Sequence, residues 1–169
     1  DLKQVIEENL PETLNMNVGL HYSLQDVIDE KITLDDFVAT LTYTELEAIS
    51  RGDYVMNSPL GTKGNAGVFG GVLETLREKG VPPITTTDGP SGIRLYATCS
   101  LIPIGTLLAS TFNEDTVYKV YSSISSEMVD KGTDMLLAPG MNIHRSVLCG
   151  RNFEYFSEDP YLAGMYAQK

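Results

Sequence analysis

The sequence predicts an α/β fold, because helical and strand patterns alternate along its central part. A helical pattern over residues 72–79 ends at a glycine, and the short run over residues 84–87 has the composition of a strand. A second helical pattern begins after Asn113, and a continuous apolar run over residues 135–138 follows it. Such short apolar runs are typical of strands that are buried on both faces in a parallel sheet. We therefore expect the helix–strand–helix–strand order that builds parallel sheets.

The first 52 residues are acidic and favour helices. Thr33, with Asp36 three residues later, has the pattern of a helix start in which the two side chains cap each other's backbone. Thr44, with Glu47 three residues later, indicates a second start. We interpret these helices as the entry to a domain rather than as a site.

Residues 51–71 are rich in glycine and small polar side chains, which predicts a loop. A phosphate-binding loop would need Ser or Thr directly after the lysine, or a strand immediately before the glycines. Lys63 is followed by Gly64, and no strand is predicted ahead of it. Nucleotide binding is therefore not expected here.

The helix after Asn113 has the strongest local signals of the chain. Asn113 is a good N-cap residue, and Gly132 is placed to end the helix. Apolar side chains recur at helical spacing, and we expect them to pack in the core. They are Val117, Val120, Tyr121, Ile124 and Met128.

Polar, glycine-containing turns follow both predicted strands, at residues 88–90 and 139–142. Ligands of α/β proteins bind at the carboxyl ends of the strands, so we expect the functional site at these two turns. In the first turn, an ionised Asp88 can accept hydrogen bonds from two adjacent sugar hydroxyls, with Arg94 six residues further on. An ordinary Asp-Gly turn beside a surface arginine fits the local sequence equally well.

The segment from residue 139 to residue 160 interleaves polar, charged and aromatic side chains without a helical or strand period. This composition suits a loop that lines a polar pocket, in which aromatic rings stack on sugar faces and Arg151 donates to hydroxyls. The alternative is an internally bonded loop, in which Arg151 pairs with Glu154 or Glu158.

Composition and charge exclude several kinds of partner. With 12 basic and 23 acidic side chains, the chain has a formal net charge of -11, which repels nucleic acid and anionic membranes. No segment has the length of apolar sequence that crosses a bilayer, and residues 1–9 do not resemble a signal peptide. We expect a soluble chain, with a cytoplasmic location slightly favoured over secretion.

Cysteine and histidine are too sparse for a disulfide scaffold or a metal centre. Cys99 and Cys149 are interpreted as two free thiols, although one bond between them remains open. His144 and Cys149 supply too few ligands for a closed metal site. We expect neither a metal nor a cofactor.

Four motifs follow one another along the chain: DGPSGIR at 88–94, STFN at 110–113, APGMNIHR at 138–145 and GRNFEYFSEDP at 150–160. Together they resemble glycoside hydrolase family three, especially its β-glucosidases. The resemblance runs from about residue 70 to residue 169, and less distinctly back to about residue 31.

The resemblance implies a retaining hydrolase that acts on terminal, non-reducing β-D-glucosyl residues, with a (β/α)8 TIM-like barrel around the sugar subsite. It implies three substrate-binding residues, which are Asp88, Arg94 and Arg151. It implies three residues that support the loop, which are Glu154, Glu158 and His144. A β-xylosidase or another β-glycosidase of the family fits the same motifs, and so does a non-catalytic carbohydrate-binding or interaction fragment.

The departures from the family pattern concern catalysis. The family continues with a Lys-His pair and a Ser-Asp-Trp motif that contains the nucleophile, but this sequence has no Trp, and His21 and His144 follow Leu20 and Ile143. The general acid also has no match. A retaining glycosidase needs two carboxyl groups about 5 to 5.5 Å apart, so a catalytic role for Asp88 alone is not favoured. We expect both catalytic residues outside this chain and no activity of the chain alone.

These observations predict a domain organisation. Residues 1–30 are expected to be a lead-in or a linker from an upstream segment, and residues 31–169 the N-terminal part of a (β/α) barrel that ends before the nucleophile. A partial barrel exposes strand edges, so we expect the remainder of the glycosidase as a partner, in the same parent chain or as a complementary polypeptide.

Overall fold

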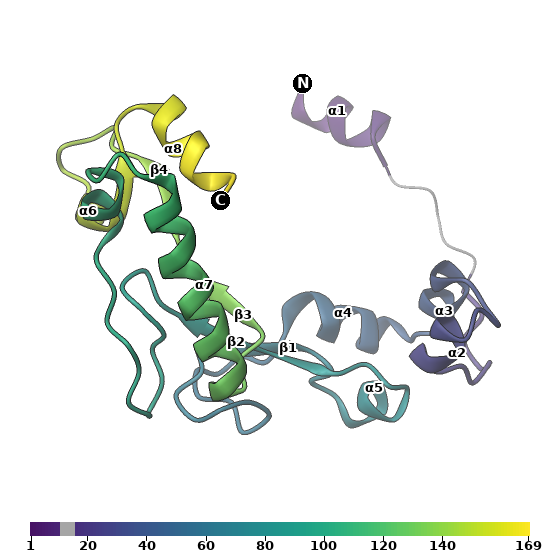
Figure 1. The fold of residues 1–169 in the computed structure, drawn as a ribbon. Coiled ribbons are helices and arrows are strands. Elements are labelled where there is room, and N and C mark those ends of the chain that lie inside the picture. The colour runs from purple at the N-terminus through teal and green to yellow at the C-terminus, as the bar shows by residue number, and fades with distance from the viewer. Residues whose placement is uncertain (11–15) are drawn as a thin grey trace.

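The computed structural model describes residues 1–10 and 16–169 (Figure 1). Residues 11–15, which belong to the expected lead-in 1–30, lie outside the described residues. In chain order the elements are α1 (Leu2–Glu8), α2 (Leu24–Ile28), α3 (Leu34–Ala39), α4 (Tyr43–Arg51), β1 (Gly67–Gly70), α5 (Glu74–Glu78), β2 (Pro83–Asp88), α6 (Gly105–Ala109), α7 (Glu114–Lys131), β3 (Met135–Leu137), β4 (Gly140–Ile143), η1 (Asn152–Glu154), β5 (Tyr155–Ser157) and α8 (Pro160–Ala167). None of the helices among these residues is long and apolar enough to cross a membrane.

The strands form two small sheets, and the α/β class is confirmed. The first sheet has the order β1-β2-β3, with β2 and β3 parallel as expected and β1 antiparallel to β2. The second sheet pairs β4 with β5 in parallel. These strands alone do not close a barrel, so the partial (β/α)8 barrel stays a proposal.

Strand β1 corrects the prediction that residues 51–71 are entirely loop. Val68 is buried and pairs with Thr85 of β2, while Gly67 and Gly70 pair with Thr86 and Pro83. The two glycines have no side chains, so the alternating pattern of a strand was hidden in the sequence. The strand forms because β2 supplies its hydrogen-bonding partner.

The predicted helix start at Thr33 is confirmed, because Thr33 Oγ1 accepts from the backbone N–H of Asp36 at 3.1 Å. The start at Thr44 is wrong. Helix α4 is capped by Thr42, whose hydroxyl accepts from the backbone N–H of Glu45 at 3.2 Å. The capping pattern occurs twice in overlapping registers, and the earlier one also brings the Glu45 carboxylate within 2.7 Å of Lys79 Nζ.

Helices α3, α4 and α5 share one buried apolar cluster, which consists of Phe37, Leu41, Ala48 and Leu76. Tyr22, Leu24 and Val27 pack against it from the region of α2. The packing of this part therefore reaches back to Tyr22, ahead of the predicted boundary at residue 31.

Helix α7 forms as predicted, with Asn113 Oδ1 accepting from the N–H of Thr116 and Gly132 ending the helix at a φ of 67°. The predicted core role is confirmed for Val117 and Ile124, which are both 2% exposed. Val117 belongs to a second buried cluster with Leu108, Ala109, Phe156 and Tyr166, which connects α6, α7, β5 and α8. This cluster supports the segment that carries Arg151.

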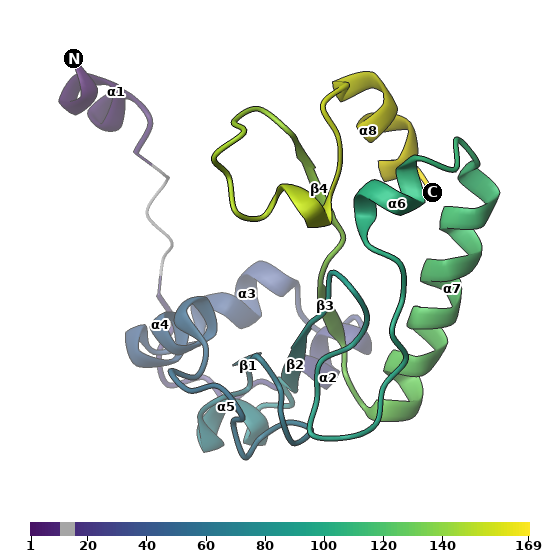
Figure 2. The ribbon, with the colours of Figure 1, turned by 90° about the vertical axis from the view of Figure 1, so that its left-hand side faces the viewer.

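Strand β3 is not buried on both faces, contrary to expectation. Met135 and Leu137 are 44% and 49% exposed, while Leu136 faces the α7 side, where it lines a cavity together with Ile124. The strand lies at the edge of its sheet, and α7 covers one side of it (Figure 2). The other face has no helix over it among the described residues.

The predicted turn at 139–142 and the expected loop up to residue 160 contain more regular structure than predicted. Strand β4 begins at Gly140, and η1 and β5 follow before α8 starts at Pro160. Strand β4, η1 and β5 have only three or four residues each, too few to show a period in the sequence.

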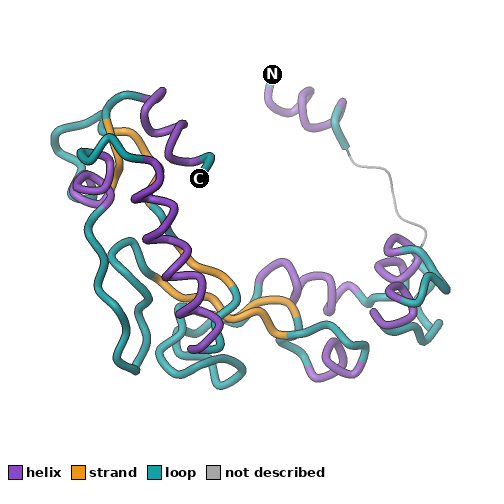
Figure 3. The backbone as a smooth tube through the Cα atoms, viewed as in Figure 1, coloured by secondary structure: helices purple, strands orange, loops and turns teal. Residues whose placement is uncertain are grey.

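The long irregular connection between β2 and α6 is clear in Figure 3.

Candidate functional site

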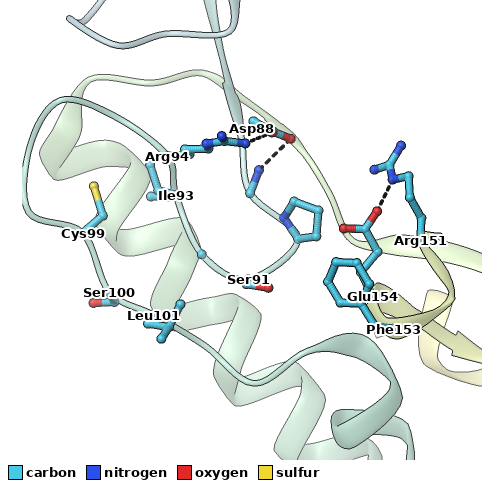
Figure 4. Close-up of a pocket in the computed structure, with 13 residues that line it drawn as sticks. Asp88, Ser91, Ile93, Arg94, Cys99, Ser100, Leu101, Arg151, Phe153 and Glu154 are labelled. Atoms are coloured by element: carbon cyan, nitrogen blue, oxygen red, sulfur yellow. Dashed lines mark hydrogen bonds and ion pairs between the residues drawn. The ribbon is translucent and has the colours of Figure 1, made fainter.

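A pocket of about 610 Å³ lies at the carboxyl end of β2. Three segments line it: the turn after β2 at 88–94, the loop residues 99–101, and the residues Arg151, Phe153 and Glu154. The pocket therefore brings residues 88–101 together with residues 151–154, which follow much later in the sequence. Figure 4 shows the Asp88–Arg94 pair and the Arg151–Glu154 pair on either side of it.

The first wall depends on the hydrogen bonds of Asp88. Its Oδ2 accepts from Arg94 Nη1 at 3.1 Å, and its Oδ1 accepts from the N–H of Gly89 at 3.1 Å. The backbone closes the same turn, because Arg94 N–H donates to the carbonyl oxygen of Asp88. The Arg94 side chain is 80% exposed, so this is both a tight Asp-Gly turn with a surface arginine and a pocket rim.

Gly92 is required by the geometry of this turn. It has a φ of 113°, and a Cβ atom at this position would lie 2.1 Å from the carbonyl oxygen of Ser100. A larger residue would push the 99–101 loop away from the turn. The close approach is what places Cys99 and Leu101 in the pocket wall.

The second wall is built around Glu154, whose side chain is only 8% exposed and which forms an ion pair with Arg151. This hydrogen bond, and then the charge of Glu154, raises the pKa of Arg151 above its ordinary value. The charge of Asp88 makes a smaller contribution in the same direction. Arg151 thus pairs with Glu154, as in the alternative of an internally bonded loop, yet its side chain remains 66% exposed and lines the pocket.

Helix α6 holds this second wall in place. Thr106 Oγ1 donates to the carbonyl oxygen of Tyr155 at 2.7 Å and lies 3.2 Å from that of Phe153. Gly105 lets the two backbones approach, because a Cβ atom there would lie 2.4 Å from the carbonyl oxygen of Glu154. No sequence motif marks Thr106, because its role depends on tertiary packing.

His144 and Glu158 lie away from the pocket lining. His144 Nε2 donates to the carbonyl oxygen of Tyr155 at 3.1 Å, and its ring stacks on that of Tyr155. Glu158 is exposed directly after β5. Cys99 and Leu101 also line the pocket although no motif marks them, whereas Ser91 and Phe153 lie inside the two motifs that form its walls.

The arrangement can bind hydroxyl groups from two sides. Carboxylate oxygens accept hydrogen bonds and guanidinium groups only donate them, so each ion pair offers both kinds of partner to a sugar hydroxyl. Cys99 and Cys149 are free thiols, as interpreted from the sequence. No group of three or more His, Cys, Asp or Glu side chains within residues 1–10 and 16–169 could hold a metal ion.

Comparison with known proteins identifies the family. The sequence profile of the "Glycosyl hydrolase family 3 N terminal domain" matches residues 62–169. The chain belongs to glycosyl hydrolase family 3. A β-glucosidase from Ruminococcus albus is 47% identical over 147 residues, which are 86% of this chain and 15% of that protein.

Solved family 3 structures give the same result. A β-glucosidase structure from Paenibacillus barengoltzii aligns with a TM-score of 0.91 and 47% identity, covering 98% of this chain and 18% of that one. β-Glucosidase 3B from Thermotoga neapolitana in complex with glucose aligns with a TM-score of 0.65 and 32% identity, covering 79% and 20%. The chain thus spans about a fifth or less of the length of these family 3 relatives.

Proposed function

We propose that this chain forms the sugar-binding wall of a retaining β-glucosidase. In this proposal Asp88, Arg94 and Arg151 bind the hydroxyls of a terminal, non-reducing β-D-glucosyl residue. The observation that supports it most directly is that these three residues, chosen from two separate motifs, line one pocket at the carboxyl end of β2.

The size and chemistry of the pocket fit this ligand. Its volume of about 610 Å³ falls within the range of roughly 300 to 1,000 Å³ that is typical of small-molecule sites. Phe153 adds an apolar face, which a pyranose ring can contact while its hydroxyls meet the charged groups. A neutral glucoside also suits a chain with a net charge of -11.

The catalytic carboxyl groups belong, in this proposal, to the remainder of the enzyme. Asp88 and Glu154 both line the pocket, but each is paired with an arginine. The carboxylate oxygens of both residues thus already accept hydrogen bonds from a guanidinium group, an arrangement that suits the binding of hydroxyl groups. The remainder would also complete the (β/α)8 barrel that residues 31–169 begin, with β3 as the edge at which the sheet continues.

Differential alkylation of the two cysteines tests sugar binding on the chain itself. Cys99 lines the proposed pocket, whereas Cys149 lies elsewhere, beside Arg145 and Asn152. We expect methyl β-D-glucoside to slow the reaction of Cys99 with iodoacetamide, measured by mass spectrometry, and to leave that of Cys149 unchanged. Equal effects on both thiols, or none on Cys99, would contradict the proposal.

The same measurement separates the related specificities. Methyl β-D-xyloside lacks the hydroxymethyl group of the glucoside, so equally strong protection by the xyloside would favour a β-xylosidase. Asp88→Asn removes the charge but keeps the shape of the side chain, and we expect it to abolish the protection of Cys99. Retained protection in this variant would remove Asp88 from the proposed site.

A further inference from the structure

Glu127 of helix α7 is hydrogen-bonded to the loop that forms one wall of the pocket at the carboxyl end of β2. Its Oε1 accepts from the backbone N–H of Ser100 at 2.9 Å, across 27 positions of the sequence. Glu127 does not line the pocket, whereas Ser100 does, together with Cys99 and Leu101. Figure 4 shows these three loop residues on the side of the pocket away from Arg151. The contact of α7 with the pocket therefore runs through this loop.

The carboxylate of Glu127 does not take the partner that its own helix offers. Lys131 lies four residues further on, which is the usual spacing of an ion pair on a helix surface. None of the ion pairs within residues 1–10 and 16–169 contains Glu127. The bond from Ser100 is also the only hydrogen bond that the Glu127 side chain forms among the described residues. The side chain thus acts on the loop and not on α7.

The loop has few other attachments in this stretch. Its two ends are fixed by backbone hydrogen bonds, which Tyr96 N–H donates at 3.1 Å and Ile102 N–H at 3.0 Å. Between these two points, the bond from Ser100 to Glu127 is the only hydrogen bond in the described part of the chain that joins the loop to a helix or strand. The Leu101 side chain is 87% exposed, so packing adds little to the hold on this stretch.

Two contacts set the position of the loop beside the turn after β2. Gly92 leaves the space into which the loop fits, but space alone does not hold it there. Glu127 supplies the attraction, because an ionised carboxylate is a strong acceptor for a backbone N–H. We propose that Glu127 is a positioning residue of the sugar pocket, which holds the wall formed by residues 99–101 in place. The inference rests on the proposed function, since it is there that the pocket binds sugar.

The rate at which iodoacetamide alkylates Cys99, measured by mass spectrometry without any sugar, tests the attachment itself. Cys99 is half-buried next to Ser100, so release of the loop should expose its thiol. We expect Glu127→Ala to raise this rate by about threefold or more. The rate at Cys149, which lines a different pocket, should not change. Glu127→Gln keeps an oxygen acceptor at the same reach and should stay within about twofold of the wild-type rate.

Two further variants separate the hydrogen bond from the negative charge. Glu127→Asp keeps the charge on a side chain that is one methylene shorter, so we expect it to raise the Cys99 rate as Glu127→Ala does. Asp130→Ala removes a charge from an exposed position of the same helix and should leave the rate unchanged. A wild-type rate in Glu127→Ala, or an equal increase in Asp130→Ala, would overturn the inference. Should Glu127→Ala lose the circular-dichroism signal of the folded chain, Glu127→Asp provides the same comparison.

The affinity for methyl β-D-glucoside, measured by calorimetry, tests the consequence for the pocket. Glu127→Ala should weaken binding by about 3- to 10-fold, the range expected for the loss of one hydrogen bond. Glu127→Gln should bind as the wild type does, although Glu127 itself does not line the pocket. An unchanged affinity in Glu127→Ala would contradict the positioning role and leave the proposed function intact. If the wild-type chain binds no sugar, the proposed function fails, and the Cys99 rates alone decide whether Glu127 holds the loop.

Discussion

The guanidinium of Arg151, a residue that lines the pocket, pairs with the carboxylate of Glu154, which is almost entirely buried, while most of the arginine side chain stays exposed. The buried partner fixes one edge of the guanidinium. The other edge keeps donors for a ligand, because the planar group carries five N–H bonds in a fixed geometry. Glu154 thus holds the Arg151 side chain in place, and Arg151 can still donate hydrogen bonds to a ligand.

Arg151→Lys should weaken sugar binding although it keeps the charge. A lysine ammonium cannot pair with Glu154 and present a second planar edge at the same time. We expect the affinity for methyl β-D-glucoside, measured by calorimetry, to fall by about tenfold or more. Arg145→Lys is the control, because this exposed arginine lines a different pocket. Equal affinities of wild type and Arg151→Lys would assign Arg151 to the loop alone.

Removing Arg151 altogether should reduce stability through the carboxylate that it leaves behind. In Arg151→Ala the buried Glu154 loses its partner, and the free energy of unfolding in urea should fall by about 1 to 3 kcal/mol. Adding Glu154→Gln removes the unpaired charge and should restore part of this loss. A double mutant no more stable than Arg151→Ala would show that Glu154 is not the cause.

Asp88→Ala should have its main effect at the transition state, once the chain is combined with the remainder of the enzyme. Hydrogen bonds to sugar hydroxyls strengthen as the ring distorts. We therefore expect kcat/KM for an aryl β-glucoside to fall roughly 100-fold or more, which corresponds to a loss of about 3 kcal/mol of transition-state stabilisation. Asp130→Asn, on the exposed side of α7, should leave kcat/KM unchanged. Near-normal kinetics of Asp88→Ala would contradict the binding role.

Helix α7 and the turn at Asp88 were predictable because their signals are local. Asn113 and Gly132 mark the ends of α7 by their own backbone chemistry, and the order Asp-Gly-Pro predicts a turn wherever it occurs. The meeting of Asp88 and Arg151 in one pocket was expected from the rule that ligands bind at the carboxyl ends of parallel strands and from the family resemblance, because no local rule connects such distant positions.

The remaining features depend on tertiary contacts that no local pattern encodes. Strand β1 requires β2 as a partner, since its two glycines carry no strand signal. The start of α4 was ambiguous in the sequence, because two capping patterns overlap. The ion pair of Glu45 with Lys79 favours the earlier pattern, which contains Glu45, over the later one, which contains Glu47. Thr106 acts only because α6 packs on the segment before β5. In each of these three places, a residue far away in the sequence decides the local structure or role.

The buried Glu45–Lys79 pair makes stability depend on pH. Burial raises the pKa of Glu45, but hydrogen bonds from Lys79 and from the backbone of Thr42 outweigh it and lower the pKa from 4.5 to about 2. The folded pKa lies below the unfolded one, so the stabilisation is present above pH 4.5 and is lost as the pH falls towards about 2.

We expect at most about 3 kcal/mol of this pH-dependent stabilisation, from the size of the pKa change. Urea unfolding of Glu45→Gln between pH 3 and pH 6 should show a smaller pH dependence than that of the wild type. Glu47→Gln is the matched control, because Glu47 pairs with Arg51 on the surface of the same helix. An identical pH dependence of wild type and Glu45→Gln would show that other carboxylates govern acid unfolding.

The exposed face of β3 should matter for assembly and not for the stability of the chain itself. Leu137 is 49% exposed at the edge of the β1-β2-β3 sheet, so Leu137→Lys should change the free energy of unfolding of the isolated chain by less than about 0.5 kcal/mol.

The assembly is tested by mixing the chain with a polypeptide that carries the remainder of a family 3 β-glucosidase. The mixture with the wild-type chain should hydrolyse an aryl β-glucoside, which neither part should do alone. The Leu137→Lys chain should fail to do so, because a charge at a sheet edge opposes the pairing of a further strand. Val129→Lys, a similar change at an exposed position of α7, should assemble normally. Full activity with Leu137→Lys would place the junction with the remainder elsewhere on the molecule.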